Sequence, residues 1–161
     1  MNRDVLIDSC VLLNLARADC ELKRIASQCV VRLFNHGVRP TLTLQNLIEF
    51  WCGATRPQSA NGLGLDCNQA FRDIELFQSF FHVFEEPADL RRTWLQIVRN
   101  YEVKGKKVHD ARLAAAMKYR RIRHMITFDV KDFKRYDGMV ILNPMDSGWE
   151  DKLLNSLPSY Y

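Results

Sequence analysis

The sequence lacks the long apolar segments that would place a protein in a membrane. No run in its 161 residues approaches the roughly 20 apolar residues that a membrane-spanning helix needs. The apolar stretch before Asp8 is only three residues long, which is too short for the apolar core of a signal peptide. We therefore expect a cytoplasmic protein without a membrane partner.

Paired cysteines of the kind that bind zinc or exchange electrons are also absent. The five cysteines stand at positions 10, 20, 29, 52 and 67, and no two of them form a C-x-x-C pair. Isolated cysteines in a reducing compartment are usually small buried residues, so all five are interpreted as structural. A zinc site is disfavoured on the same ground.

Repeats, low-complexity stretches and linkers are missing as well. The chain is 47% hydrophobic and 26% charged, which is ordinary for a globular protein, and its length suits a single hydrophobic core. We expect one domain over residues 1–145, followed by a polar C-terminal tail over residues 146–161 that carries no chemistry.

What the sequence does contain is an alternation of short apolar segments with amphipathic ones. Strands are predicted at residues 5–7, 41–44, 82–84, 125–128 and 139–142. Helices are predicted at residues 11–17, 21–34, 46–52, 68–80, 87–101 and 110–119, with a surface loop at residues 53–66. This order predicts a three-layer α/β fold, in which a central, mostly parallel sheet of about five strands is flanked by helices.

Positive charge is concentrated in one part of the chain. The net charge is +4, but residues 101–135 alone hold eleven Lys or Arg against four Asp or Glu. Such an excess would attract a polyanion such as nucleic acid. The alternative is an ordinary solvated surface of lysines and arginines.

Four carboxylates fall where a site is expected in such a fold. Asp8 and Asp129 follow predicted strands, while Glu49 and Asp110 lie early in predicted helices. Ligands bind beyond the carboxyl ends of parallel strands, and clustered carboxylates favour a hard cation such as Mg²⁺ or Mn²⁺. Each residue alone also fits a helix cap or a turn, so the hypothesis depends on the four together.

The motifs around these acids resemble those of the PIN domain family. Residues 8–13 (Asp-Ser-Cys-Val-Leu-Leu) resemble its opening motif Asp-Thr/Ser-x-x-Leu, and residues 47–51 resemble its glutamate-bearing helix. Residues 109–115 (His-Asp-Ala-Arg-Leu-Ala-Ala) resemble its His-Asp-Ala-x-Leu-Ala-Ala segment. Residues 127–133 resemble its Thr-x-Asp-x-Asp-Phe ending, with one extra residue between the two aspartates.

This resemblance implies a PIN-like fold and a ribonuclease that hydrolyses phosphodiester bonds in RNA with Mg²⁺ or Mn²⁺. The length resembles VapC-type toxins of type II toxin–antitoxin pairs, which implies a homodimer and a small cognate antitoxin. Alternatives are a non-toxin RNA-processing nuclease and an inactive RNA-binding module of the same fold. A phosphatase with Asp8 as nucleophile is a further alternative, but Cys10 occupies the place where that chemistry usually has a second aspartate.

The candidate site residues follow from these motifs and from their neighbours. The predicted catalytic metal ligands are Asp8, Glu49, Asp110 and Asp129. Ser9, Thr127 and Asp132 are candidate supporting residues, and an ordinary turn hydroxyl is the alternative for Ser9 and Thr127. His109 is a candidate partner of a carboxylate, with a capping-region or packing residue as the alternative. The candidate contacts to RNA phosphates are Arg56, Lys104, Lys106, Lys107 and Arg112.

Overall fold

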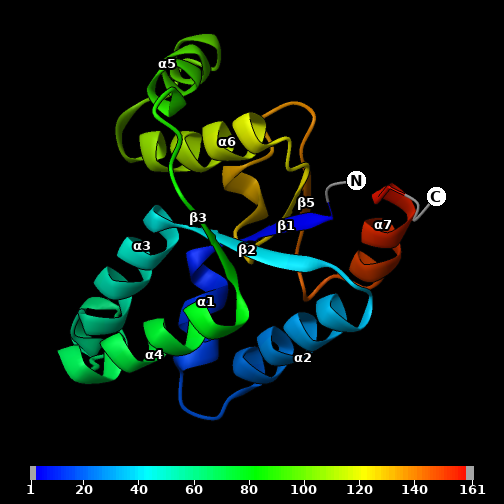
Figure 1. Ribbon diagram of the computed structural model, residues 1–161. Coiled ribbons are helices and arrows are strands. Elements are labelled where there is room, and N and C mark those ends of the chain that lie inside the picture. Colours follow the sequence, from blue (N-terminus) through cyan, green and yellow to red (C-terminus); the bar gives the residue numbers. More distant parts are fainter. Residues whose placement is uncertain (1–2, 159–161) are drawn as a thin grey trace.

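A computed structural model describes residues 3–158 of the protein. A five-stranded parallel sheet forms its centre. The strands lie in the order β3-β2-β1-β4-β5, and all four neighbouring pairs are parallel (Figure 1). Their bounds are β1 (Asp4–Ile7), β2 (Arg39–Thr43), β3 (His82–Phe84), β4 (His124–Ile126) and β5 (Val140–Leu142). The predicted α/β class and five-stranded sheet are confirmed.

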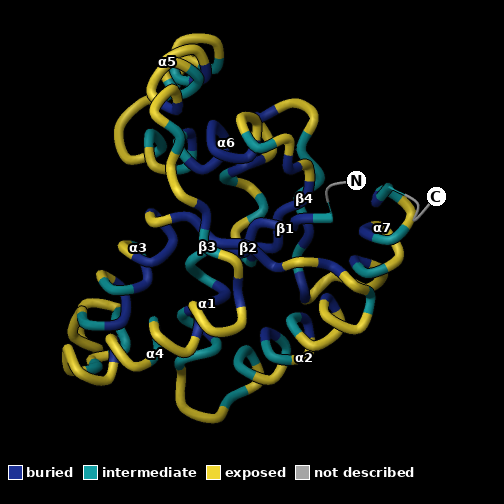
Figure 2. Tube along the Cα trace, in the orientation of Figure 1, coloured by how far each residue is buried: buried dark blue, intermediate teal, exposed yellow. Residues whose placement is uncertain are grey.

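The central strand β1 is buried on both of its faces. Val5 and Ile7 belong to one hydrophobic core, and Leu6, which points the other way, belongs to a second. Figure 2 shows the buried strands at the centre of the molecule, with exposed residues outside them. Because both faces need cover, the chain places helices on each side of the sheet.

The core that contains Val5 and Ile7 is covered by five helices. Its buried side chains come from strands and from α1 (Ser9–Ala16), α2 (Glu21–Asn35), α3 (Leu44–Thr55), α4 (Cys67–Phe80) and α7 (Trp149–Ser156). The core that contains Leu6 lies under the other two helices, α5 (Leu90–Asn100) and α6 (Val108–Arg120). The fold therefore has three layers (Figure 1).

Two segments differ from the sequence prediction. Helix α3 continues through buried Gly53 to Thr55, where a loop was expected. A Cβ atom at Gly53 would lie 2.8 Å from Leu13 Cδ1, so this glycine allows α1 and α3 to pack closely and does not break the helix. Within residues 146–161, expected to be a tail, α7 and the next residue bury Trp149, Leu153 and Leu157; residues 159–161 lie outside the described part.

None of the helices in the described part of the chain combines the length and the apolar character that crossing a bilayer requires.

Candidate active site

The topology brings the ends of β1 and β4 together. The chain leaves β1 toward β2 on one side and later returns to β4 on the other, so the crevice between β1 and β4 is a topological switch point. Asp8 directly follows β1, and its backbone N–H donates to Ile126 O of β4 at 3.0 Å. Asp129 lies three residues beyond the end of β4. Both aspartates therefore stand at the carboxyl edge of the sheet.

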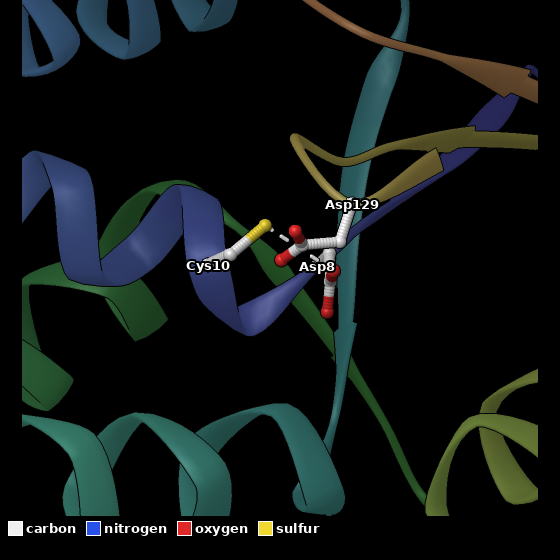
Figure 3. A group of neighbouring side chains, drawn as sticks. All are labelled: Asp8, Cys10 and Asp129. Carbon is white, nitrogen blue, oxygen red and sulfur yellow. Dashed lines mark hydrogen bonds between the residues drawn. The ribbon is translucent and has the colours of Figure 1, made fainter. Parts of the chain in front are cut away.

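Asp8, Cys10 and Asp129 form a tight cluster at this edge (Figure 3). One oxygen of each carboxylate and the Cys10 sulfur all lie within 4.8 Å of one another. Asp8 is buried, Cys10 is half-buried and Asp129 is exposed, so the cluster opens to solvent on the Asp129 side. Asp8 is also the N-cap of α1, which means that a capping role and a place in the cluster are compatible.

Hydrogen bonds hold the Asp8 carboxylate in place. It accepts from Thr127 Oγ1 at 2.6 Å, from Ser9 N at 2.7 Å and from Cys10 Sγ at 3.2 Å. Burial nevertheless raises the pKa of Asp8 from 3.8 to about 6; the bonds from Thr127 and Cys10 lower it, and repulsion from Glu49 raises it further. The charged form of Asp8 is therefore costly in this position, and a bound cation would relieve that cost.

Glu49 is linked to Asp8 through Ser9. The Ser9 hydroxyl donates to Glu49 Oε2 at 2.9 Å and lies 3.4 Å from Asp8 Oδ1. The other oxygen of Glu49 accepts from Gln45 Nε2 at 2.7 Å. Glu49 is half-buried, and its carboxylate is held by these two polar side chains.

Asp110 lies apart from the tight cluster. It sits in the first turn of α6, where Lys107 Nζ is 3.5 Å from its Oδ2 and also makes a short ion pair with Asp132. Burial raises the pKa of Asp110, Lys107 lowers it, and the charges of Asp132 and Glu49 raise it. The four predicted ligands thus line one edge of the sheet, but only Asp8 and Asp129 belong to the tight group.

The predicted phosphate contacts occupy four kinds of position. Lys104 and Lys106 are exposed beside the start of α6 and make no ion pair within residues 3–158. Lys107 is held between two aspartates, as described above. Arg112 is half-buried and pairs with Glu86. Arg56 is exposed just beyond the far end of α3, where its guanidinium lies 3.3 Å from the Cys52 sulfur.

Two residues of this site were missed by the sequence prediction. Cys10 was interpreted as structural, yet its sulfur touches Asp8 and accepts from Phe128 N at 3.3 Å. Gln45 contacts Glu49 from one helical turn earlier. Spacing of four residues on a predicted helix was the available signal for Gln45. His109 lies in the first turn of α6 with an exposed ring, and its backbone carbonyl accepts from Gln45 Nε2. Among residues 3–158 its ring makes no hydrogen bond to a carboxylate, so the carboxylate-partner alternative is not supported.

The donor atoms of the cluster fit a hard divalent cation. Burial, followed by the nearby Asp8 carboxylate, raises the pKa of the Cys10 thiol well above its ordinary value. In the metal-free protein the Cys10 thiol therefore donates a hydrogen bond, and the cluster offers one sulfur and no histidine, unlike the Cys- and His-rich ligand sets of zinc sites. The remaining donors are carboxylate oxygens, which suit Mg²⁺ or Mn²⁺.

A three-layer α/β domain with carboxylates gathered at the carboxyl edge of its sheet belongs to the α/β proteins that bind ligands or metals beyond the ends of parallel strands. A sequence profile of the PIN domain matches residues 5–139. Since this match covers most of the chain, the protein belongs to the PIN domain family, whose members are nucleases.

Solved structures agree with this fold. The VapBC2 complex of Rickettsia felis, bound to promoter DNA, has a TM-score of 0.67 at 12% identity, covering 87% of this chain and 98% of that one. VapBC of Salmonella typhimurium bound to DNA gives 0.62 at 18% identity, covering 89% and 99%. A toxin–antitoxin complex of Klebsiella pneumoniae gives 0.60 at 21% identity, covering 88% and 98%. No curated protein matched the sequence.

Proposed function

We propose that this protein is a metal-dependent endoribonuclease and the toxin of a type II toxin–antitoxin pair. The observation that carries the proposal is the placement of Asp8 and Asp129 within 4.8 Å of each other at the switch point of a PIN fold. A buried carboxylate whose pKa is raised to about 6 is a poor structural element without a cation, which supports a metal site over a purely structural cap.

In this proposal Asp8 and Asp129 hold Mg²⁺ or Mn²⁺, and Glu49 and Asp110 complete the ligand set directly or through water. When bound, the metal lowers the pKa of a coordinated water and stabilises the negative charge that develops on the phosphate. Thr127 donates to Asp8 and accepts from the backbone N–H of Asp129 at 2.9 Å, so it fixes the two aspartates relative to each other.

Three further side chains complete this arrangement. Ser9 bridges Asp8 and Glu49 through its hydroxyl. Lys107, held by Asp132, keeps a positive charge beside Asp110 and so favours the ionised form of that carboxylate. Asp132 acts through Lys107, and Ser9 acts by joining the two carboxylates that it contacts.

RNA is proposed as the substrate because of the family resemblance and the charge of residues 101–135. Lys104 and Lys106 are exposed beside the amino end of α6, next to the acid-lined edge, so their ammonium groups are free to contact phosphates. Arg56 lies about 10 Å along α3 from Glu49, at the 1.5 Å rise per residue of a helix, and would contact only a longer RNA.

The direct test is cleavage of a labelled RNA by purified protein. We expect cleavage with Mn²⁺ or Mg²⁺, none in EDTA, and loss of cleavage in Asp8→Asn and Asp129→Asn. Asp151→Asn, on the exposed face of α7, is the matched control and should cut normally. RNA that is bound with a steep salt dependence but never cut would favour the alternative, an inactive RNA-binding module.

An apolar groove supports the proposal of a protein partner. It has a volume of about 370 Å³ and is lined by α2 and α4, with Val31, Phe34, Leu76 and Phe80 all exposed along it. Exposed apolar surface of this kind marks interaction sites, and several proteins of similar fold were solved as toxin–antitoxin complexes. We assign the groove to an amphipathic helix of a small antitoxin.

Helix α4 offers a matched pair of variants for testing the groove. Phe80 lines it and is 61% exposed, whereas Phe71 is 55% exposed and lies outside it. We expect a small gene beside this protein's own gene to encode the antitoxin. Phe80→Ser should weaken binding of that antitoxin, and Phe71→Ser should not. The absence of such a gene, or equal binding by both variants, would contradict the assignment.

The expected homodimer stays a prediction. Light scattering should give twice the 18.8 kDa mass of one chain. If Phe80→Ser instead converts a dimer to a monomer, the groove belongs to the second copy and not to an antitoxin.

A further inference from the structure

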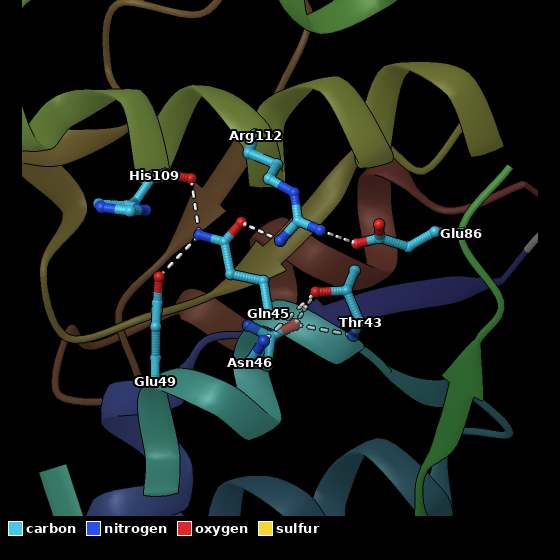
Figure 4. A network of polar contacts seen from close by, with 7 residues as sticks. All are labelled: Thr43, Gln45, Asn46, Glu49, Glu86, His109 and Arg112. Atoms are coloured by element: carbon cyan, nitrogen blue, oxygen red, sulfur yellow. Dashed lines mark hydrogen bonds and ion pairs between the residues drawn. The ribbon is translucent and has the colours of Figure 1, made fainter. Parts of the chain in front are cut away.

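Gln45 is a buried polar side chain whose every hydrogen-bonding group is used. It is 3% exposed and lies in the first turn of α3. Its amide nitrogen donates to Glu49 Oε1 at 2.7 Å and to the backbone carbonyl of His109 at 2.8 Å, while its oxygen accepts from Arg112 Nη1 at 2.9 Å (Figure 4). The side chain thus joins α3 to α6 directly beside a candidate metal ligand.

The neighbours of Gln45 dictate which way its amide points. Arg112 can only donate, so the oxygen of the amide must face it. The Glu49 carboxylate and the His109 carbonyl can only accept, so the NH₂ group must face them. Arg112 is itself fixed by an ion pair with Glu86. The orientation is therefore set by a chain of partners from Glu86 through Arg112 and Gln45 to Glu49.

The start of α3 is fixed as well. Thr43 and Asn46 form a capping box, in which each side chain bonds the other residue's backbone N–H. Gln45 and Glu49 are four residues apart and so lie on one face of the helix. With Ser9 on Oε2 and Gln45 on Oε1, each oxygen of Glu49 has its own anchor.

We propose that Gln45 is a positioning residue that holds the Glu49 carboxylate toward the metal site, and that Arg112 acts through Gln45 and not on RNA. This inference rests on the proposed metal-dependent function. A long, flexible glutamate that is fixed in advance loses less side-chain entropy when it binds a cation. Without Gln45, the Ser9 hydroxyl would be the one remaining side-chain donor to the Glu49 carboxylate among residues 3–158.

The test measures Mn²⁺ affinity by calorimetry on metal-free protein, without RNA. Gln45→Met keeps the size of the side chain and removes its hydrogen bonds. We expect about a tenfold or greater loss of Mn²⁺ affinity, as is typical when a residue that orients a metal ligand is lost. Gln96→Met, on the exposed side of α5, is the matched control and should bind Mn²⁺ like the wild type.

A double-mutant cycle separates positioning from general destabilisation. If Gln45 acts through Glu49, Gln45→Met should have little further effect on Mn²⁺ affinity in a Glu49→Gln background. If Gln45 has only a structural role, Gln45→Met should lower the melting temperature in both the wild-type and the Glu49→Gln backgrounds. In the wild-type background it should then leave the Mn²⁺ affinity unchanged. That second pattern would overturn the inference.

Arg112→Met gives an independent reading, including the case where Gln45→Met does not fold. Our inference predicts weaker Mn²⁺ binding, with no additional loss when the two variants are combined. If Arg112 instead contacts an RNA phosphate directly, Arg112→Met should leave the Mn²⁺ affinity unchanged. The slope of the logarithm of RNA affinity against the logarithm of salt concentration should then become shallower by about one. If the wild type binds no Mn²⁺, the proposed function fails; if it binds and both variants bind equally well, only the role of Gln45 fails.

Discussion

Replacing Asp8 by Asn should make the metal-free protein more stable. Burial raises the pKa of Asp8 from 3.8 to about 6, and each pKa unit corresponds to about 1.4 kcal/mol. The carboxylate therefore costs about 3 kcal/mol of folding free energy at neutral pH. An uncharged Asn avoids this cost but donates where a carboxylate accepts, so we expect a net gain of about 1–3 kcal/mol.

The gain should depend on pH in a definite direction. The pKa of Asp8 is higher in the folded protein, so protonation of Asp8 favours the folded state. This contribution to the free energy of unfolding is fully present below pH 3.8 and is lost as the pH rises through about 6. The stability of Asp8→Asn relative to the wild type should thus be highest at pH 7.5 and should fall by about 3 kcal/mol at and below pH 3.8, where the variant has no advantage left.

Urea denaturation in EDTA at several pH values measures this difference directly. Added Mn²⁺ should then stabilise the wild type and leave Asp8→Asn unchanged, because only the wild type keeps the ligand. An Asp8→Asn variant that is no more stable than the wild type at pH 7.5 in EDTA would refute the argument that the buried charge is costly.

Three other predictions concern the rest of the chain. His124 is 3% exposed and hydrogen-bonded to Ser156, and burial lowers its pKa to about 4. The unfolded chain binds this proton from pH 6.5 downward, whereas the folded protein does not until about pH 4. The free energy of unfolding of the wild type, measured with urea, should therefore fall by up to about 3 kcal/mol between pH 6.5 and 4 relative to that of His124→Gln. Phe50→Ala, at a fully buried ring packed edge-on against Phe77, should lower the free energy of unfolding by about 3–5 kcal/mol. Lys106→Ala should make the slope of the logarithm of RNA affinity against the logarithm of salt concentration shallower by about one. The Mn²⁺ affinity measured by calorimetry should stay unchanged.

The sequence was sufficient to place the two central aspartates. Asp8 and Asp129 follow apolar strands, and the carboxyl ends of parallel strands share one edge, so their proximity followed from topology. The fold class followed from the alternation of strands and helices. Helix α7 was missed because it is short and because polar and turn-forming residues surround it, although its buried residues Trp149 and Leu153 are spaced four apart, as on one face of a helix.

The rest of the site depends on contacts between distant segments. Arg112 and Lys106 are both basic residues near the same helix end, yet one is enclosed by Glu86 and Gln45 and the other is exposed. Composition cannot separate these two cases, because the partners lie far away in the sequence. Cys10 was undervalued for the same reason, since Thr127 and Phe128, 117 and 118 residues later, complete its surroundings.

The claim at the centre of this account is that Asp8 and Asp129 share a divalent cation. A crystal soaked in MnCl₂ and measured for anomalous scattering tests it most directly. We predict an anomalous peak between the two carboxylates, at about 2.0–2.3 Å from an oxygen of each, with Glu49 or Asp110 reached directly or through water. A crystal soaked in excess MnCl₂ that shows no anomalous peak at this edge of the sheet would contradict the claim.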